Sequence, residues 1–245
     1  MNRLSLAPLA LGVALIAAAC GGDGVDTPSS KIFETPAWDG EELFTYTLTQ
    51  NDRVYGKCEA TTEPDGDTTT LRLHCFNDTG DRDDRTVIVE SDTLKPLRSE
   101  RTVTSINTVT TVEYHPPTAT FTTAEEGKDP RTRDRDLPTK DSEDDPEPGY
   151  YDDNSLFWLL RGLPLEEDWT GGFHDINPGA LVQIVEAEFE VRERVEIDVP
   201  AGTFDTWRVL LRTPSVGQYL WVEVEAPYRV IRADLDGVRY ELSED

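Results

Sequence analysis

The residue types that most often perform chemistry show no arrangement typical of an active site. The three histidines, His74, His115 and His174, have no metal-ligand spacing to one another or to a cysteine. The sequence contains no GxSxG motif, no phosphate-binding glycine loop and no dinucleotide fingerprint. With 49 Asp and Glu residues, some acidic pair will lie close by chance, so such a pair does not indicate a glycosidase. We therefore expect a non-catalytic protein with no cofactor and no metal site.

Two of the three cysteines lie in a predicted β-hairpin. Residues 57–62 and 68–76 alternate like antiparallel strands, and a four-residue loop between them places Cys58 directly opposite Cys75. Directly opposed residues on antiparallel strands are close enough for a disulfide. A metal or redox pair is the alternative, but the spacing fits no metal signature and His74 should point to the other face. We predict a Cys58–Cys75 disulfide, as expected in an oxidising compartment.

The third cysteine, Cys20, follows a predicted signal peptide at residues 1–19. That segment has a short basic start, an apolar run too short to span a bilayer, and three alanines at its end. Small residues immediately before a cysteine resemble the lipobox of bacterial lipoproteins, which implies cleavage before Cys20 and acylation of its sulfur. Two acyl chains would anchor the protein stably to a membrane. Ordinary secretion with cleavage near Ala19 is the alternative.

The organisation predicted after the signal peptide is a lipidated cysteine with a flexible tether at residues 20–36, then one domain at 37–245. Gly21 favours sorting to the outer membrane in an organism that has one, and the location is extracytoplasmic in either case. The formal net charge of −26 and the pI near 4.3 argue against nucleic acid or an anionic membrane surface as partners. We expect a monomer.

Residues 127–148 are almost free of apolar side chains and carry four prolines, so they predict a long, disordered acidic loop. The acidic run beginning at Asp141 lacks the glycine and the ligand spacing of a calcium-binding loop. Specific calcium binding there is left open.

Strand patterns dominate the rest of the domain. From Val185 to Val199 apolar residues alternate with charged ones, and only Glu193 breaks the series, which indicates a bulge. Further alternating strands follow to Leu242. Residues 155–161 predict one short apolar helix, capped by Asp153 or Asn154 and too short to be stable alone. The predicted fold is therefore mainly β, a single strongly curved antiparallel sheet, half-barrel or open barrel, wrapped around that helix.

Aromatic residues near the helix are the candidates for a binding site. We expect Trp158, Trp207 and Trp221 to line an apolar groove between helix and sheet, with Arg161 available for an anionic head group. The structural alternative is that the three indoles are ordinary core and that Arg161 forms an ion pair with one of the many acids.

A family resemblance supports this reading of the fold. Six segments in this order carry it: residues 94–97, 154–161, 163–165, 199–204, 219–221 and 230–232. Together they resemble an uncharacterised family of exported bacterial β-proteins, DUF3108, which is similar in shape to the half-barrel lipoprotein carriers LolA and LolB. The resemblance covers residues 38–242 and implies a curved sheet around a helix, but no established activity.

Two functions follow as hypotheses. The first is non-catalytic binding of a hydrophobic ligand or an exported lipoprotein in the half-barrel groove. The second is a structural or interaction scaffold of the cell envelope, in which the protein's own helix fills the cavity and the acidic surface meets a basic partner.

Overall fold

The computed structural model describes residues 30–140, 147–179 and 183–244. The predicted signal peptide, the lipidated Cys20 and most of the acidic run that begins at Asp141 lie outside the described residues.

The described chain forms one sheet of fifteen strands in the order β8-β7-β6-β5-β4-β3-β2-β1-β15-β14-β13-β12-β11-β10-β9. All neighbours are antiparallel except β9 and β10, which are parallel. The strands are β1 Glu42–Gln50, β2 Arg53–Asp65, β3 Thr68–Asn77, β4 Arg82–Glu90, β5 Pro96–Val103, β6 Thr108–His115, β7 Thr118–Glu125, β8 Arg131–Asp136, β9 Tyr150–Asp152, β10 Thr170–Asn177, β11 Gln183–Val199, β12 Gly202–Arg212, β13 Gly217–Glu223, β14 Val230–Leu235 and β15 Val238–Ser243. The predicted single, mainly antiparallel sheet is confirmed, and the bulge expected at Glu193 appears as a register shift between Val191 and Arg194.

The chain contains two short 3-10 turns in its described part, η1 Thr104–Ile106 and η2 Asp153–Ser155, and one α-helix, α1 Leu156–Arg161. The predicted helix is therefore present, directly after η2. Asp152 caps η2 by accepting a hydrogen bond from the Asn154 backbone N–H at 2.9 Å, whereas Ser155 at the start of α1 makes no side-chain capping bond, so neither Asp153 nor Asn154 caps the helix as predicted. None of the described helices reaches the length and apolar character needed to cross a membrane.

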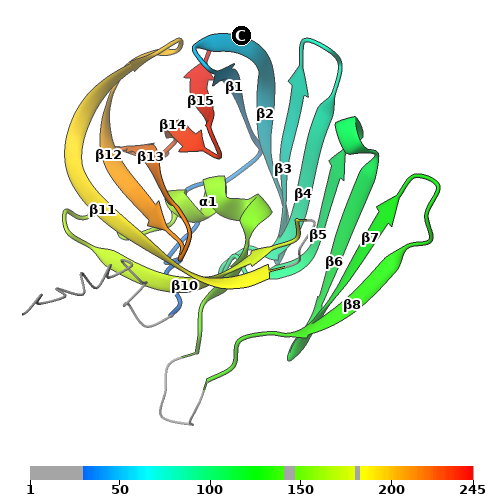
Figure 1. The fold of residues 1–245 in the computed structure, drawn as a ribbon. Coiled ribbons are helices and arrows are strands. Elements are labelled where there is room, and N and C mark those ends of the chain that lie inside the picture. The colour runs from blue at the N-terminus through cyan, green and yellow to red at the C-terminus, as the bar shows by residue number, and fades with distance from the viewer. Residues whose placement is uncertain (1–29, 141–146, 180–182, 245) are drawn as a thin grey trace, which may run out of the picture.

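All six residues of α1 are buried, and they contact strands on different sides of the helix. The Trp158 indole N–H donates to Thr62 Oγ1 of β2 at 2.8 Å. The Phe157 ring meets Tyr46 of β1 and Tyr240 of β15, with ring centroids 5.3 and 5.6 Å apart. Figure 1 shows α1 against one face of the sheet, with β11 to β13 on one side of it and β2 to β4 on the other. The apolar side chains of that face pack on the helix in one core.

The edge strand β9 lies against β5 and β6, which are the fourth and third strands from the opposite edge of the same sheet. The Tyr114 hydroxyl of β6 donates to Asp152 Oδ2 at 2.5 Å, and Asn154 Nδ2 donates to Ser99 Oγ of β5 at 2.9 Å. A second apolar cluster that includes Phe121, Tyr150 and Ile176 fills the space between β6, β7 and the β9–β10 pair. The short parallel strand β9 is thus covered on its open side.

Three segments differ from expectation. Within the predicted disordered loop, residues 131–136 form β8, which pairs with β7 although every one of its residues is exposed. Residues 170–177, for which the sequence shows no strand alternation, form β10 with Phe173 only 1% exposed. The predicted tether ends earlier than residue 36, because Ile32 and Phe33 are buried in the core and donate backbone N–H groups to the Tyr151 hydroxyl. In each case the pairing comes from backbone hydrogen bonds and tertiary contacts that leave no apolar periodicity in the sequence.

Cys58 and Cys75 are directly opposed on β2 and β3, and they form a disulfide. The same row continues across the sheet, with Tyr46 of β1 opposite Cys58 and Asp83 of β4 opposite Cys75. Both cysteines are buried on the face that carries α1.

Replacing both cysteines with alanine should lower the free energy of unfolding by about 3 kcal/mol, because the bond closes a loop of 17 residues in the unfolded chain. Urea denaturation of the oxidised protein and the variant measures this. A reducing agent should destabilise the wild-type chain and leave the variant unchanged. Equal stability of the two oxidised proteins would contradict the prediction.

Candidate ligand-binding site

Two of the predicted site residues, Trp158 and Arg161, lie together in α1 but are engaged by the protein itself. Trp158 is 2% exposed and its N–H is bonded to Thr62. The Arg161 guanidinium donates to both carboxylate oxygens of Glu42, at 2.7 and 3.0 Å, and to the Pro227 carbonyl at 3.0 Å. Its charge also lies over the rings of Trp38 and Phe44, 5.4 and 5.2 Å from their centroids. In this arrangement Arg161 has the structural ion pair that was the alternative to a head-group contact.

The other two predicted residues do not join them. Trp207 of β12 is half-buried on the core face, opposite Val222 of β13. Trp221 of β13 points to the other face, opposite Arg208 and Arg232, with the Arg232 guanidinium 4.5 Å from its ring centroid. The four residues therefore do not line one groove.

A polar cavity lies at the other end of α1, beside the first residues of the helix. A cavity of about 600 Å³ is bounded by strands from both halves of the sheet and by the start of the helix. Its lining includes Leu73, Phe157 and Tyr240, and the charged residues Asp83, Arg85, Arg101, Asp153, Asp175 and Asp236. This volume is within the range of small-molecule sites.

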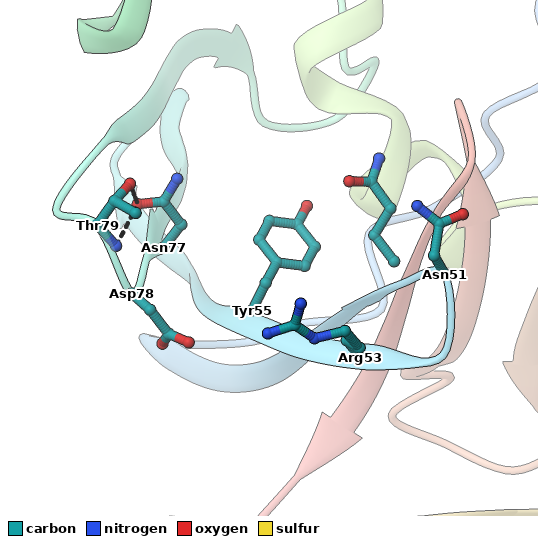
Figure 2. Close-up of a pocket in the computed structure, with 7 residues that line it drawn as sticks. Asn51, Arg53, Tyr55, Asn77, Asp78 and Thr79 are labelled. Carbon is teal, nitrogen blue, oxygen red and sulfur yellow. Dashed lines mark hydrogen bonds between the residues drawn. The ribbon is translucent and has the colours of Figure 1, made fainter.

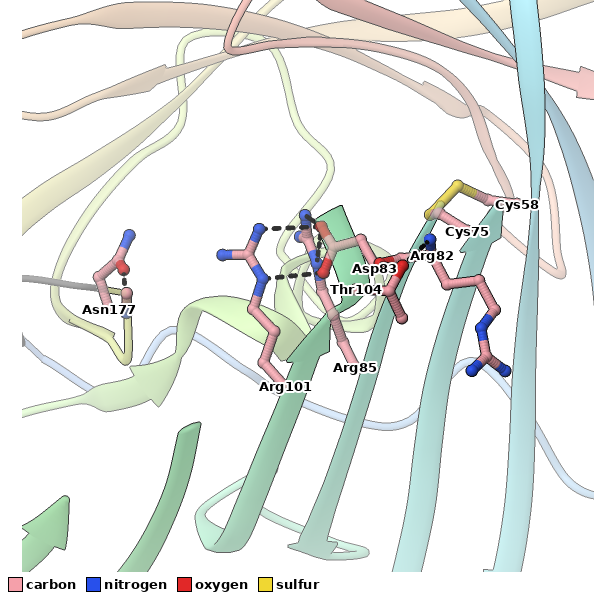
Figure 3. A network of polar contacts seen from close by, with 9 residues as sticks. Cys58, Cys75, Arg82, Asp83, Arg85, Arg101, Thr104 and Asn177 are labelled. Carbon is pink, nitrogen blue, oxygen red and sulfur yellow. Dashed lines mark hydrogen bonds and ion pairs between the residues drawn. A yellow bond between two sulfur atoms is a disulfide. The ribbon is translucent and has the colours of Figure 1, made fainter. Parts of the chain in front are cut away.

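One wall of this cavity is an ion cluster on β4 and β5. Arg85 and Arg101 are directly opposite each other, and Asp83 lies between them. Arg101 donates to both Asp83 oxygens at 2.8 Å, and Arg85 donates to Oδ2 at 2.8 Å (Figure 3). Burial alone would raise the pKa of the Asp83 carboxyl, but the two guanidinium groups outweigh it and hold that pKa at about 2. Asp83 is therefore ionised and saturated with donors.

Other carboxyl groups at the cavity have less compensation: Asp153 and Asp175 line it, and Asp152 is buried directly before Asp153 in the chain. Burial raises the pKa of Asp152 to about 6, although the Tyr114 hydroxyl and the Asn154 N–H both stabilise its charged form. Burial also raises the pKa of Asp153, which Arg85 and Arg101 only partly oppose. The pKa of Asp175 is well above its usual range because of burial, with Asp153 and Asp152 adding like charge. Perturbed carboxyls in a cavity mark a functional-site candidate.

Asn154 follows Asp153 in the chain and also lines the cavity. It is 3% exposed, its Nδ2 is used by Ser99, and its Oδ1 has no hydrogen-bond partner. Buried polar atoms are nearly always paired, so this acceptor is one of a few exceptions in the described part of the chain. The sequence predicted Asn154 only as a capping residue.

A second pocket of about 460 Å³ lies beside Tyr55, which also lines the large cavity. Figure 2 shows the Tyr55 ring between Asn51 and the turn at Asn77, where Asn77 Oδ1 accepts from the Thr79 hydroxyl at 2.7 Å. Arg53 and Asp78 complete its rim. The two pockets thus share one aromatic wall. No group of three or more His, Cys, Asp or Glu in the described chain is disposed to hold a metal ion.

Comparisons with known proteins give a family but no activity. Residues 45–243 match the model of a family described as a protein of unknown function, DUF3108. No curated protein matches the sequence. A crystal structure from Bacteroides fragilis, described as an exported protein with a YmcC-like fold, is 9% identical over 87% of this chain and 98% of that chain, with a TM-score of 0.31. At that TM-score the likeness carries no information on the site.

Glu42→Gln should lower the free energy of unfolding by about 3 kcal/mol, since it leaves the Arg161 charge buried without its carboxylate. Chemical denaturation measures the loss. Glu63→Gln is the matched control, because its partner Arg72 and Glu63 itself are 42% and 48% exposed and such pairs contribute below about 1 kcal/mol. Equal effects of the two substitutions would contradict the structural role of Arg161.

The raised pKa of Asp152 predicts a pH-dependent loss of stability. The folded chain keeps this proton up to about pH 6, whereas the unfolded chain releases it near pH 3.8. The contribution is therefore full below pH 3.8 and is lost as the pH rises to 6, by about 3 kcal/mol. Asp152→Asn should remove this loss, so its stability relative to the wild-type chain should rise by that amount between pH 4 and 7.

Tyr114→Phe tests the same assignment by raising the pKa of Asp152 instead of removing its carboxyl group. Loss of its hydroxyl hydrogen bond raises the pKa of Asp152 further, so stability should go on falling above pH 6. Asp153 and Asp175 contribute with the same sign in all three proteins, and Asp152→Asn also removes the like charge that Asp152 adds beside Asp175. Parallel pH profiles for the three proteins would contradict the assignment.

Proposed function

Because the chain belongs to the DUF3108 family, whose description assigns no activity, we propose a function from the site: a lipid-anchored, extracytoplasmic, non-catalytic binding protein that holds a small polar ligand in the charged cavity. In this proposal the sheet is a half-barrel around α1, similar in shape to LolA and LolB. The single observation that carries it is the cavity of about 600 Å³ with charged groups on facing walls.

The half-barrel form is supported by contacts between strands far apart in the sheet order. Asp152 of β9 accepts from Tyr114 of β6, and the helix next to β9 reaches Thr62 of β2. An open sheet in which one edge touches a strand near its other edge must curve around what lies between, and here that is α1. The disulfide supports an oxidising compartment, and the apolar segment with small residues before Cys20 supports acylation there.

The polar cavity is a better candidate site than an apolar groove beside α1. The side chains of α1 themselves fill the apolar interior, and Trp158 and Arg161 are both bonded within the protein. A hydrophobic ligand or a lipoprotein would have to displace them. A polar ligand in the cavity displaces no core residue.

A scaffold without a ligand is the second candidate, favoured by the same self-filled apolar core and by the net charge of −26. Its partner would be a basic envelope protein. Capture of that partner should be lost at moderate salt, because exposed charge contacts are screened.

Native mass spectrometry of the full chain, equilibrated with an envelope extract, tests the binding function. We expect a small mass adduct on the wild-type protein that disappears in Val185→Trp, because Val185 lines the cavity beside its strand partner Asp175 and the indole would occupy that space. Glu186→Trp is the matched control, since this neighbour is exposed on the opposite face of β11 and should keep the adduct.

The two candidate functions differ in which proteins keep the mass adduct. An adduct kept by both variants would place the ligand outside the charged cavity. An unmodified wild-type mass in every extract would contradict binding and leave the scaffold.

A further inference from the structure

The amide side chains of the domain are confined to one end of the sheet. The sequence has six asparagines and three glutamines, and all of them except Asn2 lie in the described residues. They gather at the end of the sheet where β1, β3 and β10 finish and β11 and β13 begin: Gln50, Asn51, Asn77, Asn107, Asn154, Asn177, Gln183 and Gln218. The turns at the opposite end contain none, although asparagine is favoured in turns at either end and glutamine is not a turn residue. Turn preference therefore does not explain this distribution.

Six of these amides line the two cavities that share Tyr55. The pocket of about 460 Å³ has Gln50, Asn51 and Asn77 in its lining. The cavity of about 600 Å³ has Asn177, Gln183 and Gln218. The half-buried Tyr55 ring belongs to both linings, and Figure 2 shows it between Asn51 and Asn77. The amides thus surround one aromatic ring.

Several of these amides have hydrogen-bonding capacity left. Within the described residues, the side chains of Gln50 and Asn51 make no hydrogen bond. Asn177 uses its Oδ1, which accepts from the Gly179 N–H at 2.8 Å, and its Nδ2 remains available. Gln218 uses its Nε2, which donates to Asp236 Oδ1 at 3.2 Å, and its Oε1 remains available. The cavities therefore offer donors and acceptors together.

We propose that this end of the sheet binds a neutral oligosaccharide, with one sugar ring packed on Tyr55 and hydroxyl groups bonded to the amides of the two cavities. A hydroxyl group both donates and accepts, as an amide does, whereas an ammonium group only donates and a carboxylate only accepts. The C–H face of a sugar ring is apolar and suits an aromatic ring. This inference rests on the proposed binding function, adds the chemical class of the ligand and extends the site to the second pocket.

The charged groups of the larger cavity also suit an uncharged ligand. Arg85 and Arg101 both donate to Asp83, which occupies them. Burial raises the pKa of Asp153 and of Asp175, so it favours the neutral form of both carboxyl groups. A charged ligand would have to compete with the first arrangement or ionise the second.

Isothermal titration calorimetry of the full chain tests the proposal with four neutral trisaccharides: cellotriose, maltotriose, laminaritriose and chitotriose, the trimer of N-acetylglucosamine. At least one should bind, and at least tenfold more tightly than its own monosaccharide, because the amides span two cavities. Tyr55→Leu should weaken that trisaccharide at least tenfold, since leucine keeps apolar packing but has no flat ring.

Asn51→Gly and Asn107→Gly form a matched pair of variants. Both asparagines are exposed and have a left-handed backbone, with φ of 51° and 48°, which glycine adopts without strain. Only Asn51 lines a cavity. Asn51→Gly should weaken the trisaccharide at least threefold, and Asn107→Gly should leave its affinity unchanged. Thermal melting checks that all three variants are folded.

Binding of none of the trisaccharides would overturn the proposal, as would wild-type affinity in both Tyr55→Leu and Asn51→Gly. If the envelope adduct is still lost in Val185→Trp while all four trisaccharides fail, the ligand class is wrong and the binding function stands. If the wild-type protein also shows no adduct, both fail.

Discussion

The structure depends on the burial of a helix that is too short to be stable alone. Six residues make fewer than two turns of α-helix, so α1 exists only through its contacts with the sheet. Burying Arg161 in that position needs a partner, and Glu42 of β1 supplies a bidentate one. Since β1 pairs with both β2 and β15, this ion pair ties the helix to the point where the two halves of the sheet meet. The apolar core forms around that anchor.

The inner face of the sheet changes character along its strands. On β4 the inward positions Val89 and Val87 are fully buried, but the next two inward residues are Arg85 and Asp83. A core designed only for stability would continue the apolar series, because buried charge pairs rarely outperform packed hydrophobic residues. Here the disulfide lies in the same row as Asp83, so a covalent bond stabilises the region in which charged residues replace apolar packing. This combination is typical of a site for which stability is sacrificed.

Much of the fold could be predicted from the sequence because the sheet alternates. The apolar series from Val185, its break at Glu193 and the opposition of Cys58 and Cys75 follow from a period of two and a loop length. The same alternation also predicts charged residues on the inner face. Arg85 is in phase with the buried Val87 and Val89 on β4, and Asp175 is in phase with the buried Phe173 on β10. A charged residue in phase with buried positions is the pattern to look for. It indicates an inward charge but not its partner, because Arg85 and Arg101 meet only through strand pairing.

The segments that could not be predicted have tertiary causes. Strand β10 has no apolar alternation, and Gly171 is required there because a side chain would collide with the Trp169 ring. Strand β8 has only exposed residues, and it is held by its backbone ladder to β7. Its alternating arginines and aspartates suit an edge, where exposed charges discourage pairing with another chain. The other edge, β9, is protected differently, by side chains of β5 and β6. The contact that covers β9 also brings Asp153 and Asn154 to the cavity wall. Protection of this sheet edge and placement of Asp153 and Asn154 at the cavity are thus one arrangement, whereas Asp175 reaches the cavity from strand β10.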